Sequence, residues 1–207
     1  LMVWVGRFAL SIESVSGSRK KNSRGVVMYN VPQPDEDSSS GPLMVLIWLL
    51  LGALPSTALL ATTNLLTSEV ASNPFLWVLP LSLYLITFIL CFESDRWYKR
   101  GVCFPALLLS VIFTLPVFKS GTNADLSTQI ISFCAAGFFI ALCCHGELAK
   151  LKPPAAYLTL FYLMISIGGA FGGVFVALVA PVLFNDIYEF HLSAGGAIVL
   201  TVLVVSL

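Results

Sequence analysis

The chain has 207 residues, of which 57% are hydrophobic and 11% are charged. A soluble domain needs a polar shell, usually with about 25% charged residues, so the composition argues against a soluble protein. The formal net charge is zero, which gives no reason to expect a nucleic-acid partner. We therefore expect the lipid bilayer to surround most of this chain.

The first 42 residues are predicted to be a cytoplasmic segment and flexible linker. Residues 1–10 are apolar apart from Arg7 and fit either the tail of an upstream helix or a surface amphipathic helix. The basic cluster Arg19–Arg24 fits a topology signal or a site for anionic lipid headgroups. Residues 31–42 are rich in Pro, Ser and acidic residues and cannot bury enough surface to fold alone.

Six long uncharged stretches follow. A helix needs roughly 20 mostly apolar residues to cross about 30 Å of hydrocarbon, and at least five of the stretches supply them. The sequence predicts an all-α fold, a polytopic transmembrane helical bundle in residues 43–207. Its spans are expected at residues 43–64, 73–92, 102–118, 126–144, 155–184 and 192–207.

The basic residues indicate the orientation of this bundle. Ten of the 11 Lys and Arg residues fall before the first span or on alternate loops, and only Lys119 falls on the other side. Cytoplasmic loops carry an excess of Lys and Arg. The loops around Arg96 and Lys150 are therefore predicted to be cytoplasmic, as are both termini. The chain begins with Leu and stops within an apolar run, so we expect it to be part of a longer protein.

The first span is unusually polar in its second half. Pro55 lies in its interior, where proline removes a backbone donor and kinks a helix. Thr62, Thr63 and Asn64 follow, with Glu69 beyond them. One interpretation is the polar wall of a cavity near the outer leaflet with Glu69 at its mouth; the alternative is a kinked helix whose polar end meets the headgroups.

The end of the fourth span places His145 and Glu147 two residues apart. Ionisable residues at membrane depth are candidates for function, and a His beside a carboxylate can relay a proton. Residues two apart, however, point to different sides of a helix. The alternative is that the helix ends here in a polar turn at Gly146.

The fifth span is too long for a perpendicular crossing, so it must tilt, bend or continue past the membrane. Its centre holds two overlapping small-residue pairs, Gly168 with Gly172 and Gly169 with Gly173. Such pairs let a second helix approach closely. We expect them to pack against a further helix of this chain or of another membrane protein.

The five cysteines show neither metal-ligand spacing nor a disulfide framework,. They are expected to be small buried apolar residues, and no cofactor, metal site or catalytic residue is predicted. They are Cys91, Cys103, Cys134, Cys143 and Cys144.

Two runs carry a resemblance to a known family. They are TTNLLTSEVASNPFLWVLPLSLYLITFILCFESDRWYKR at residues 62–100 and CHGELAKLKPPAAYLTLFYLMISIGGAFGGVFVALVAP at residues 144–181. They resemble the membrane region of bacterial fused transporter-like and spermidine-synthase-like proteins, chiefly in PFLWVLPL and CHGEL. The resemblance covers about residues 43–189. It implies a major-facilitator-like membrane region in a bacterial inner membrane, joined to an aminopropyltransferase-like domain outside these residues.

Three functions fit these observations. The chain is expected to be a non-catalytic membrane module, a scaffold or accessory subunit that packs on other chains or further helices. Half of a transport-like bundle for a small polar or cationic metabolite is one alternative. The membrane anchor of an aminopropyltransferase-like enzyme is the other, with activity only in a longer chain.

Overall fold

The computed structural model describes residues 20–21, 27–28, 41–69, 76–94, 96–120, 125–184 and 188–206. Side chains are described at all of these positions except 20–21, 27–28, 68, 69 and 120. The chain divides into two compact units, Leu1–Ser39 and Ser40–Leu207. The predicted helix tail at residues 1–10 lies outside the described residues.

The first unit is described only at two short strands. Strand β1 is Lys20–Lys21 and strand β2 is Val27–Met28, and they pair antiparallel with Lys20 opposite Met28. Part of the basic cluster predicted at Arg19–Arg24 therefore lies in a strand.

The second unit is an all-α bundle. Five helices in its described residues are long and apolar enough to cross a membrane, as the uncharged stretches predicted. The elements in chain order are α2 (Pro42–Glu69), α3 (Val78–Glu93), α4 (Arg100–Ser120), α5 (Leu126–Lys150), the 3₁₀ turn η3 (Ala155–Tyr157), α6 (Leu158–Val174), the π-helical turn η4 (Phe175–Val179), α7 (Ala180–Leu183) and α8 (Glu189–Ser206).

Helix α3 is shorter than the five helices that could cross a membrane. It has 16 residues, about 24 Å of helix, which is less than the hydrocarbon thickness of about 30 Å. The prediction began this span at residue 73, but the described helix begins at Val78, and residues 70–75 lie outside the described residues.

Helix α5 is longer than predicted. The end expected at Cys144 is wrong, because the helix continues to Lys150. Lys150 lies in the last turn, where a positive charge stabilises the helix end through the helix dipole,. Pro153 and Pro154 follow and prevent the helix from continuing. His145, Gly146 and Glu147 therefore lie inside the helix.

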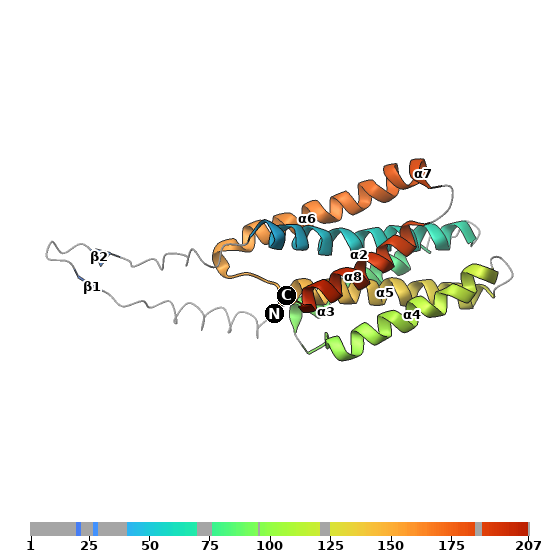
Figure 1. Cartoon of the computed structure of the whole chain (residues 1–207), viewed down its shortest axis with the longest axis horizontal. Helices are drawn as coiled ribbons and strands as arrows, with labels where there is room; N and C mark the ends of the chain where they lie inside the picture. The colour runs from blue at the N-terminus through green and yellow to red at the C-terminus, as the bar shows by residue number, and fades with distance from the viewer. Residues whose placement is uncertain are drawn as a thin grey trace. The chain divides into compact units, whose positions relative to one another are not determined.

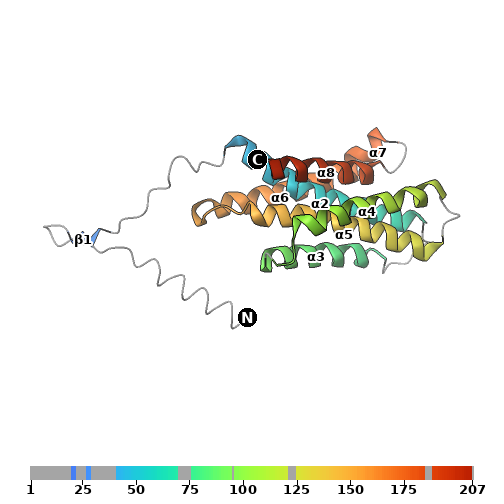
Figure 2. The same ribbon diagram turned by 60° about the horizontal axis from the view of Figure 1, so that its bottom comes forward.

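Helices α2 and α5 form the centre of the bundle (Figure 1). Helix α2 packs against α5, α6 and α8, and α5 packs against α3, α4 and α8. Figure 2 shows α3 and α8 on opposite sides of this central pair. Two buried clusters fill the interior, one around Trp48, Leu107 and Phe161, and the other around Leu66, Phe133 and Phe190.

The contact between α2 and α6 depends on glycine. A Cβ atom at Gly168 would lie 2.1 Å from the Leu49 carbonyl oxygen, and one at Gly172 would lie 2.4 Å from that of Ala53. On the other helix, a Cβ atom at Gly52 would lie 2.8 Å from the Ile165 carbonyl oxygen. At each contact a glycine of one helix therefore lies directly against the backbone of the other, as in close-packed membrane helices.

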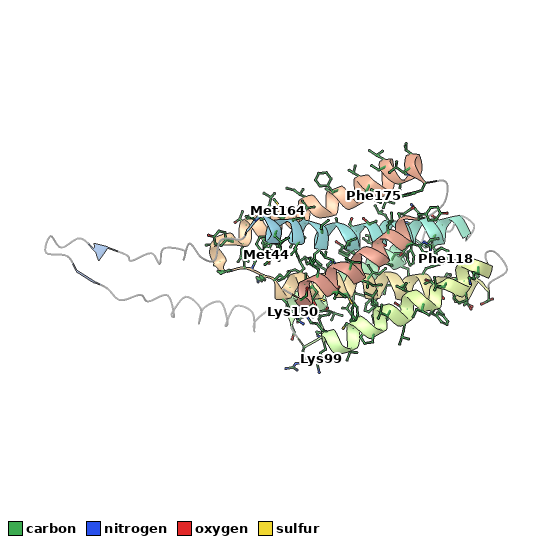
Figure 3. All side chains as sticks on the ribbon, viewed as in Figure 1. Met44, Lys99, Phe118, Lys150, Met164 and Phe175 are labelled. Carbon is green, nitrogen blue, oxygen red and sulfur yellow. The ribbon has the colours of Figure 1, made fainter. Side chains whose placement is uncertain are left out.

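Successive long helices run in opposite directions, so five of the six Lys and Arg residues described in this unit collect at one end of the bundle, while Lys119 lies at the other. We call the end that carries the five residues the basic end. It is where α3 and α5 finish and α4 and α6 start, and it carries Arg96, Lys99, Arg100, Lys150 and Lys152. Figure 3 shows Lys99 and Lys150 together at this end and Phe118 at the other.

Candidate functional site: a buried polar cluster at the basic end

The last turns of α5 carry polar side chains into the interior of the bundle. Cys143, Cys144, His145, Glu147 and Leu148 are all almost completely buried. The alternative of a polar turn at Gly146 is wrong, because Gly146 lies within the helix. Burying an ionisable side chain costs free energy unless it is paired and hydrogen-bonded, so the partners of His145 and Glu147 define the site.

Glu147 is paired on both of its carboxylate oxygens. Arg100, the first residue of α4, donates from Nε to Oε1 at 2.8 Å and from Nη2 to Oε2 at 2.6 Å. The Tyr98 hydroxyl also donates to Oε1, at 2.6 Å. The Glu147 side chain is 0% exposed, whereas that of Arg100 is 39% exposed. This two-pronged geometry is the strong form of an Arg–carboxylate contact, and it ties the α3–α4 connection to α5.

Tyr98 is the residue around which this cluster is built. Its ring lies on Gly146, where a Cβ atom would be 2.2 Å from the ring carbon Cγ. The Nζ atom of Lys150 lies over the same ring, 4.5 Å from its centroid, within the range of a cation–π contact. Burial raises the pKa of the Tyr98 hydroxyl above its ordinary value, and the hydrogen bond to Glu147 raises it further.

His145 occupies a separate aromatic site formed with α3. Its ring makes T-shaped contacts with the rings of Tyr84 and Phe88, at centroid distances of 5.0 Å and 5.2 Å. Its Nδ1 atom lies 3.0 Å from the Thr87 hydroxyl oxygen. That hydroxyl donates its single proton to the Tyr84 carbonyl at 2.7 Å, so Nδ1 must carry the proton of the Thr87–His145 hydrogen bond.

His145 and Glu147 therefore do not form one relay. The histidine has its hydrogen bond with α3, and the carboxylate has its bonds with Tyr98 and Arg100. This separation follows from their spacing of two residues along a helix.

The polar residues predicted on the first span do not meet around one large cavity. Thr62 is buried, and its hydroxyl has no hydrogen-bond partner among the described residues. It lines a small cavity between α2, α3 and α5, with Pro55, Tyr84 and Gly137 among the other lining residues. The cavity volume of ≈ 10 Å³ is about the least that holds one water molecule.

The other predicted residues of that group lie apart. The Thr63 hydroxyl donates to the Leu59 carbonyl of its own helix at 2.8 Å, and Asn64 is exposed. Glu69 ends α2, but its side chain lies outside the described part of the chain. Pro55 does not interrupt α2, and the neighbouring Ser56 hydroxyl donates to the Gly169 carbonyl at 2.9 Å.

The four glycines predicted to pack helices fall into two pairs with different surroundings. Gly168 and Gly172 are buried against α2. Gly169 has no atom within 4 Å of a Cβ position, and Gly173 has only Leu60 Cδ1, at 3.8 Å. Helix α6 thus uses one glycine pair inside the bundle and leaves the second pair open.

Sequence reasoning missed Tyr98, Arg100, Thr87 and Tyr84 as parts of the site. Trp97 and Tyr98 together resemble an interfacial anchor, and Arg100 is one of several topology-setting cations. Trp97 has the exposure that such an anchor needs, at 59%, whereas Tyr98 is only 4% exposed. Gly146 was a signal in the sequence, because a glycine beside Glu147 leaves room for an aromatic ring to pack on the helix. It does not identify Tyr98 as the residue that supplies the ring.

No group of three or more His, Cys, Asp or Glu residues in the described segments could hold a metal ion. All five cysteines are buried and free. Comparison with known proteins finds no matching family model, no similar curated protein and no similar solved structure. The resemblance of residues 62–100 and 144–181 therefore stays a prediction.

Proposed function

We propose that this chain is a non-catalytic, multi-pass membrane module that packs against further transmembrane helices as a scaffold or accessory subunit of a larger assembly. Following the resemblance described above, we place it in the inner membrane of a bacterium, in a spermidine-synthase-like fused protein. The partner helices belong either to the same longer chain or to other membrane proteins.

The open face of α6 is the observation that carries this proposal. Within the described residues α6 packs mainly on α2, and it forms one edge of the bundle with η4 and α7 (Figure 1). Small residues recur on its outward side at spacings of three and four, which places them on one face of a helix. They are Ser166, Gly169, Ala170 and Gly173. Membrane helices use such small-residue stripes for close packing.

The buried polar cluster also supports a module without chemistry of its own. Both Glu147 oxygens already accept hydrogen bonds, and the Arg100 fork is occupied by them. Three of the roughly four acceptor sites of this carboxylate are occupied, and the side chain is fully buried, so it holds helices together and is not exposed to a substrate. The cavity beside Thr62, at ≈ 10 Å³, is far below the roughly 300 Å³ of a metabolite-sized pocket, which gives the transport alternative less support.

The test measures the size of the assembly that the purified chain forms. It compares variants that carry leucine on the small-residue stripe of α6 with a variant that carries leucine elsewhere. The double variant Gly169→Leu/Gly173→Leu fills the stripe, and Gly195→Leu adds the same side chain on α8, where no atom lies within 4 Å of a Cβ position. Native mass spectrometry in mild detergent, from membranes of the source organism, measures the assembly.

We expect the unaltered chain and Gly195→Leu to appear in an assembly larger than a monomer, and the double variant to appear as a folded monomer. An unaltered chain that is monomeric and has no further transmembrane helices in its own polypeptide, or an assembly of separate chains that survives the double variant, would contradict the proposal.

A further inference from the structure

We propose that the basic end of the bundle binds an anionic phospholipid, with the headgroup on exposed lysine and arginine side chains and the acyl chains along α4. This inference is independent of what packs on α6. The cations that would hold the headgroup come from the α3–α4 connection and from the end of α5, two segments about 50 residues apart in the sequence. They are Arg96, Lys99, Lys150 and Lys152, which we call the basic platform.

The basic platform is not neutralised by the carboxylates described near it. Within the described residues, Glu147 is the ion-pair partner of Arg100, and no other ion pair is found at this end. Glu93 is exposed, and Asp95 lies in the same connection of the sequence. The five Lys and Arg residues of the basic end outnumber these three carboxylates, so a net positive charge faces the membrane surface.

The Glu147 cluster fixes the two halves of the basic platform beside each other. The bonds from Tyr98 and Arg100 to Glu147 hold the connection that carries Arg96 and Lys99 against α5. Lys150 sits over the Tyr98 ring, and Figure 3 shows Lys99 and Lys150 at the same end of the bundle. A preformed site costs little ordering free energy when a ligand binds.

The apolar surface next to the basic platform favours a lipid over a soluble anion. Trp97 is 59% exposed and Val102 is 65% exposed, and tryptophan prefers the membrane interface. Further along the same outward side of α4, Leu109 is 68% exposed and Ile112 is 59% exposed. An amphiphile can use both the cations and this apolar stripe, whereas a soluble anion can use only the cations.

The size of the effect follows from the number of cations. A Lys or Arg near an anionic membrane surface contributes about 1 kcal/mol, which corresponds to about fivefold in affinity. Removing two cations is therefore expected to weaken binding roughly 25-fold, and removing one should weaken it about fivefold.

The experiment measures lipid binding to the full chain by native mass spectrometry, with phosphatidylglycerol and phosphatidylcholine as probes. We expect phosphatidylglycerol to bind at least tenfold more tightly. Lys99→Gln/Lys150→Gln should remove that preference, whereas Lys119→Gln, an exposed cation at the opposite end, should keep it. Equal binding of the two lipids, or an equal loss in Lys119→Gln, would overturn the proposal.

Two further arms separate the remaining explanations. Lys150 contacts Tyr98, so replacing Lys150 could loosen the fold. The variant Lys99→Gln/Lys152→Gln leaves that contact intact and should lose the preference for phosphatidylglycerol to the same degree. Free glycerol phosphate carries the same phosphate without acyl chains and should not compete at equal concentration. Competition by glycerol phosphate would show a soluble-anion site and overturn the lipid assignment.

Discussion

Arg100 and Glu147 form a two-pronged ion pair in which one partner is partly exposed and the other is fully buried. The Nε–Oε1 and Nη2–Oε2 distances are 2.8 Å and 2.6 Å, and the side-chain exposures are 39% and 0%. This asymmetry makes the two partners unequal when either is removed, because only Arg100 can turn toward water. A buried charge left alone is the more costly outcome.

Arg100→Gln is therefore expected to destabilise the bundle more than Glu147→Gln. Losing the arginine leaves a buried carboxylate uncompensated, at a cost of about 3 kcal/mol or more. Losing the carboxylate charge leaves a neutral amide that still accepts from Tyr98, at a cost of about 1–2 kcal/mol. Thermal unfolding in mild detergent measures both.

The double variant Arg100→Gln/Glu147→Gln shows how the effects of the two substitutions on stability combine. We expect it to be more stable than Arg100→Gln alone, because it no longer buries an unpaired charge. If adding Glu147→Gln lowers the stability further, the carboxylate in the single variant is not buried and charged as described.

Gly146→Ala is expected to destabilise the bundle, against the usual preference. In a helix interior, alanine is normally better than glycine by about 1 kcal/mol. At this position a Cβ atom would lie 2.2 Å from Cγ of Tyr98, so the ring must move and its bond to Glu147 is strained. We expect a loss of about 1–3 kcal/mol, read from the unfolding temperature.

Gly195→Ala is the matched control for that variant. Gly195 also lies within a helix, and no atom lies within 4 Å of its Cβ position. It should be neutral or slightly stabilising. Equal effects of the two substitutions would mean that the Tyr98 ring does not rest on Gly146.

Tyr98 is expected to stay protonated at a pH at which ordinary tyrosines ionise. Its pKa is raised by burial and by the bond to Glu147, from an ordinary value of about 10. Because the folded state holds this proton more tightly, Tyr98 contributes its stability fully below about pH 10. That stability is lost as the pH rises further, since the unfolded state releases the proton first.

Tyrosinate absorbance of the unaltered chain and Tyr98→Phe tests this. The folded proteins should titrate with equal amplitude around pH 10, although the chain has six tyrosines and the variant one fewer. In denaturant the unaltered chain should exceed the variant by one tyrosine. If the folded variant titrates one tyrosine fewer around pH 10 than the folded unaltered chain, the pKa of Tyr98 is not raised.

Two buried threonines should respond in opposite ways to replacement by valine. Thr87→Val removes the acceptor of the His145 Nδ1 proton, whose partner lies at 3.0 Å, and should cost about 1–3 kcal/mol of stability. The Thr62 hydroxyl has no partner among the described residues, so Thr62→Val should be neutral or stabilising. Denaturation in detergent compares them, and a cost at Thr62 equal to that at Thr87 would reveal a water in the neighbouring cavity.

The fold was predictable because it depends on long apolar stretches whose length is set by the bilayer. All six predicted spans overlap helices of the structure. The ends were less predictable, because a helix stops according to local stabilisation and not where charge reappears. Helix α5 passes the charged residue Glu147 and ends only before Pro153, and α8 begins at Glu189, where an acidic residue favours a first turn.

The site was predictable only in part. His145 and Glu147 stood out as ionisable residues near membrane depth, and their spacing indicated that they point apart. Their partners could not be found, because Tyr98, Arg100 and Thr87 are separated from them by 47 to 58 residues. Nothing local in the sequence distinguishes Arg100, which reaches the carboxylate, from Lys99, which is exposed.

The π-helical turn Phe175–Val179 alters how the last part of the fifth span is oriented. The Ala180 amide donates to the Phe175 carbonyl five residues back, and Pro181 supplies no donor and crowds the carbonyl four residues before it. The buried residues Gly168, Gly172, Val176 and Ala180 recur every four positions, and each step overshoots a regular turn by about 40°. The π-helical turn holds more residues than an α-helical turn, so it offsets part of this rotation of the buried face around the helix. Deleting one residue within it should swing Ala180 by about 100° and turn a lipid-facing side chain inward.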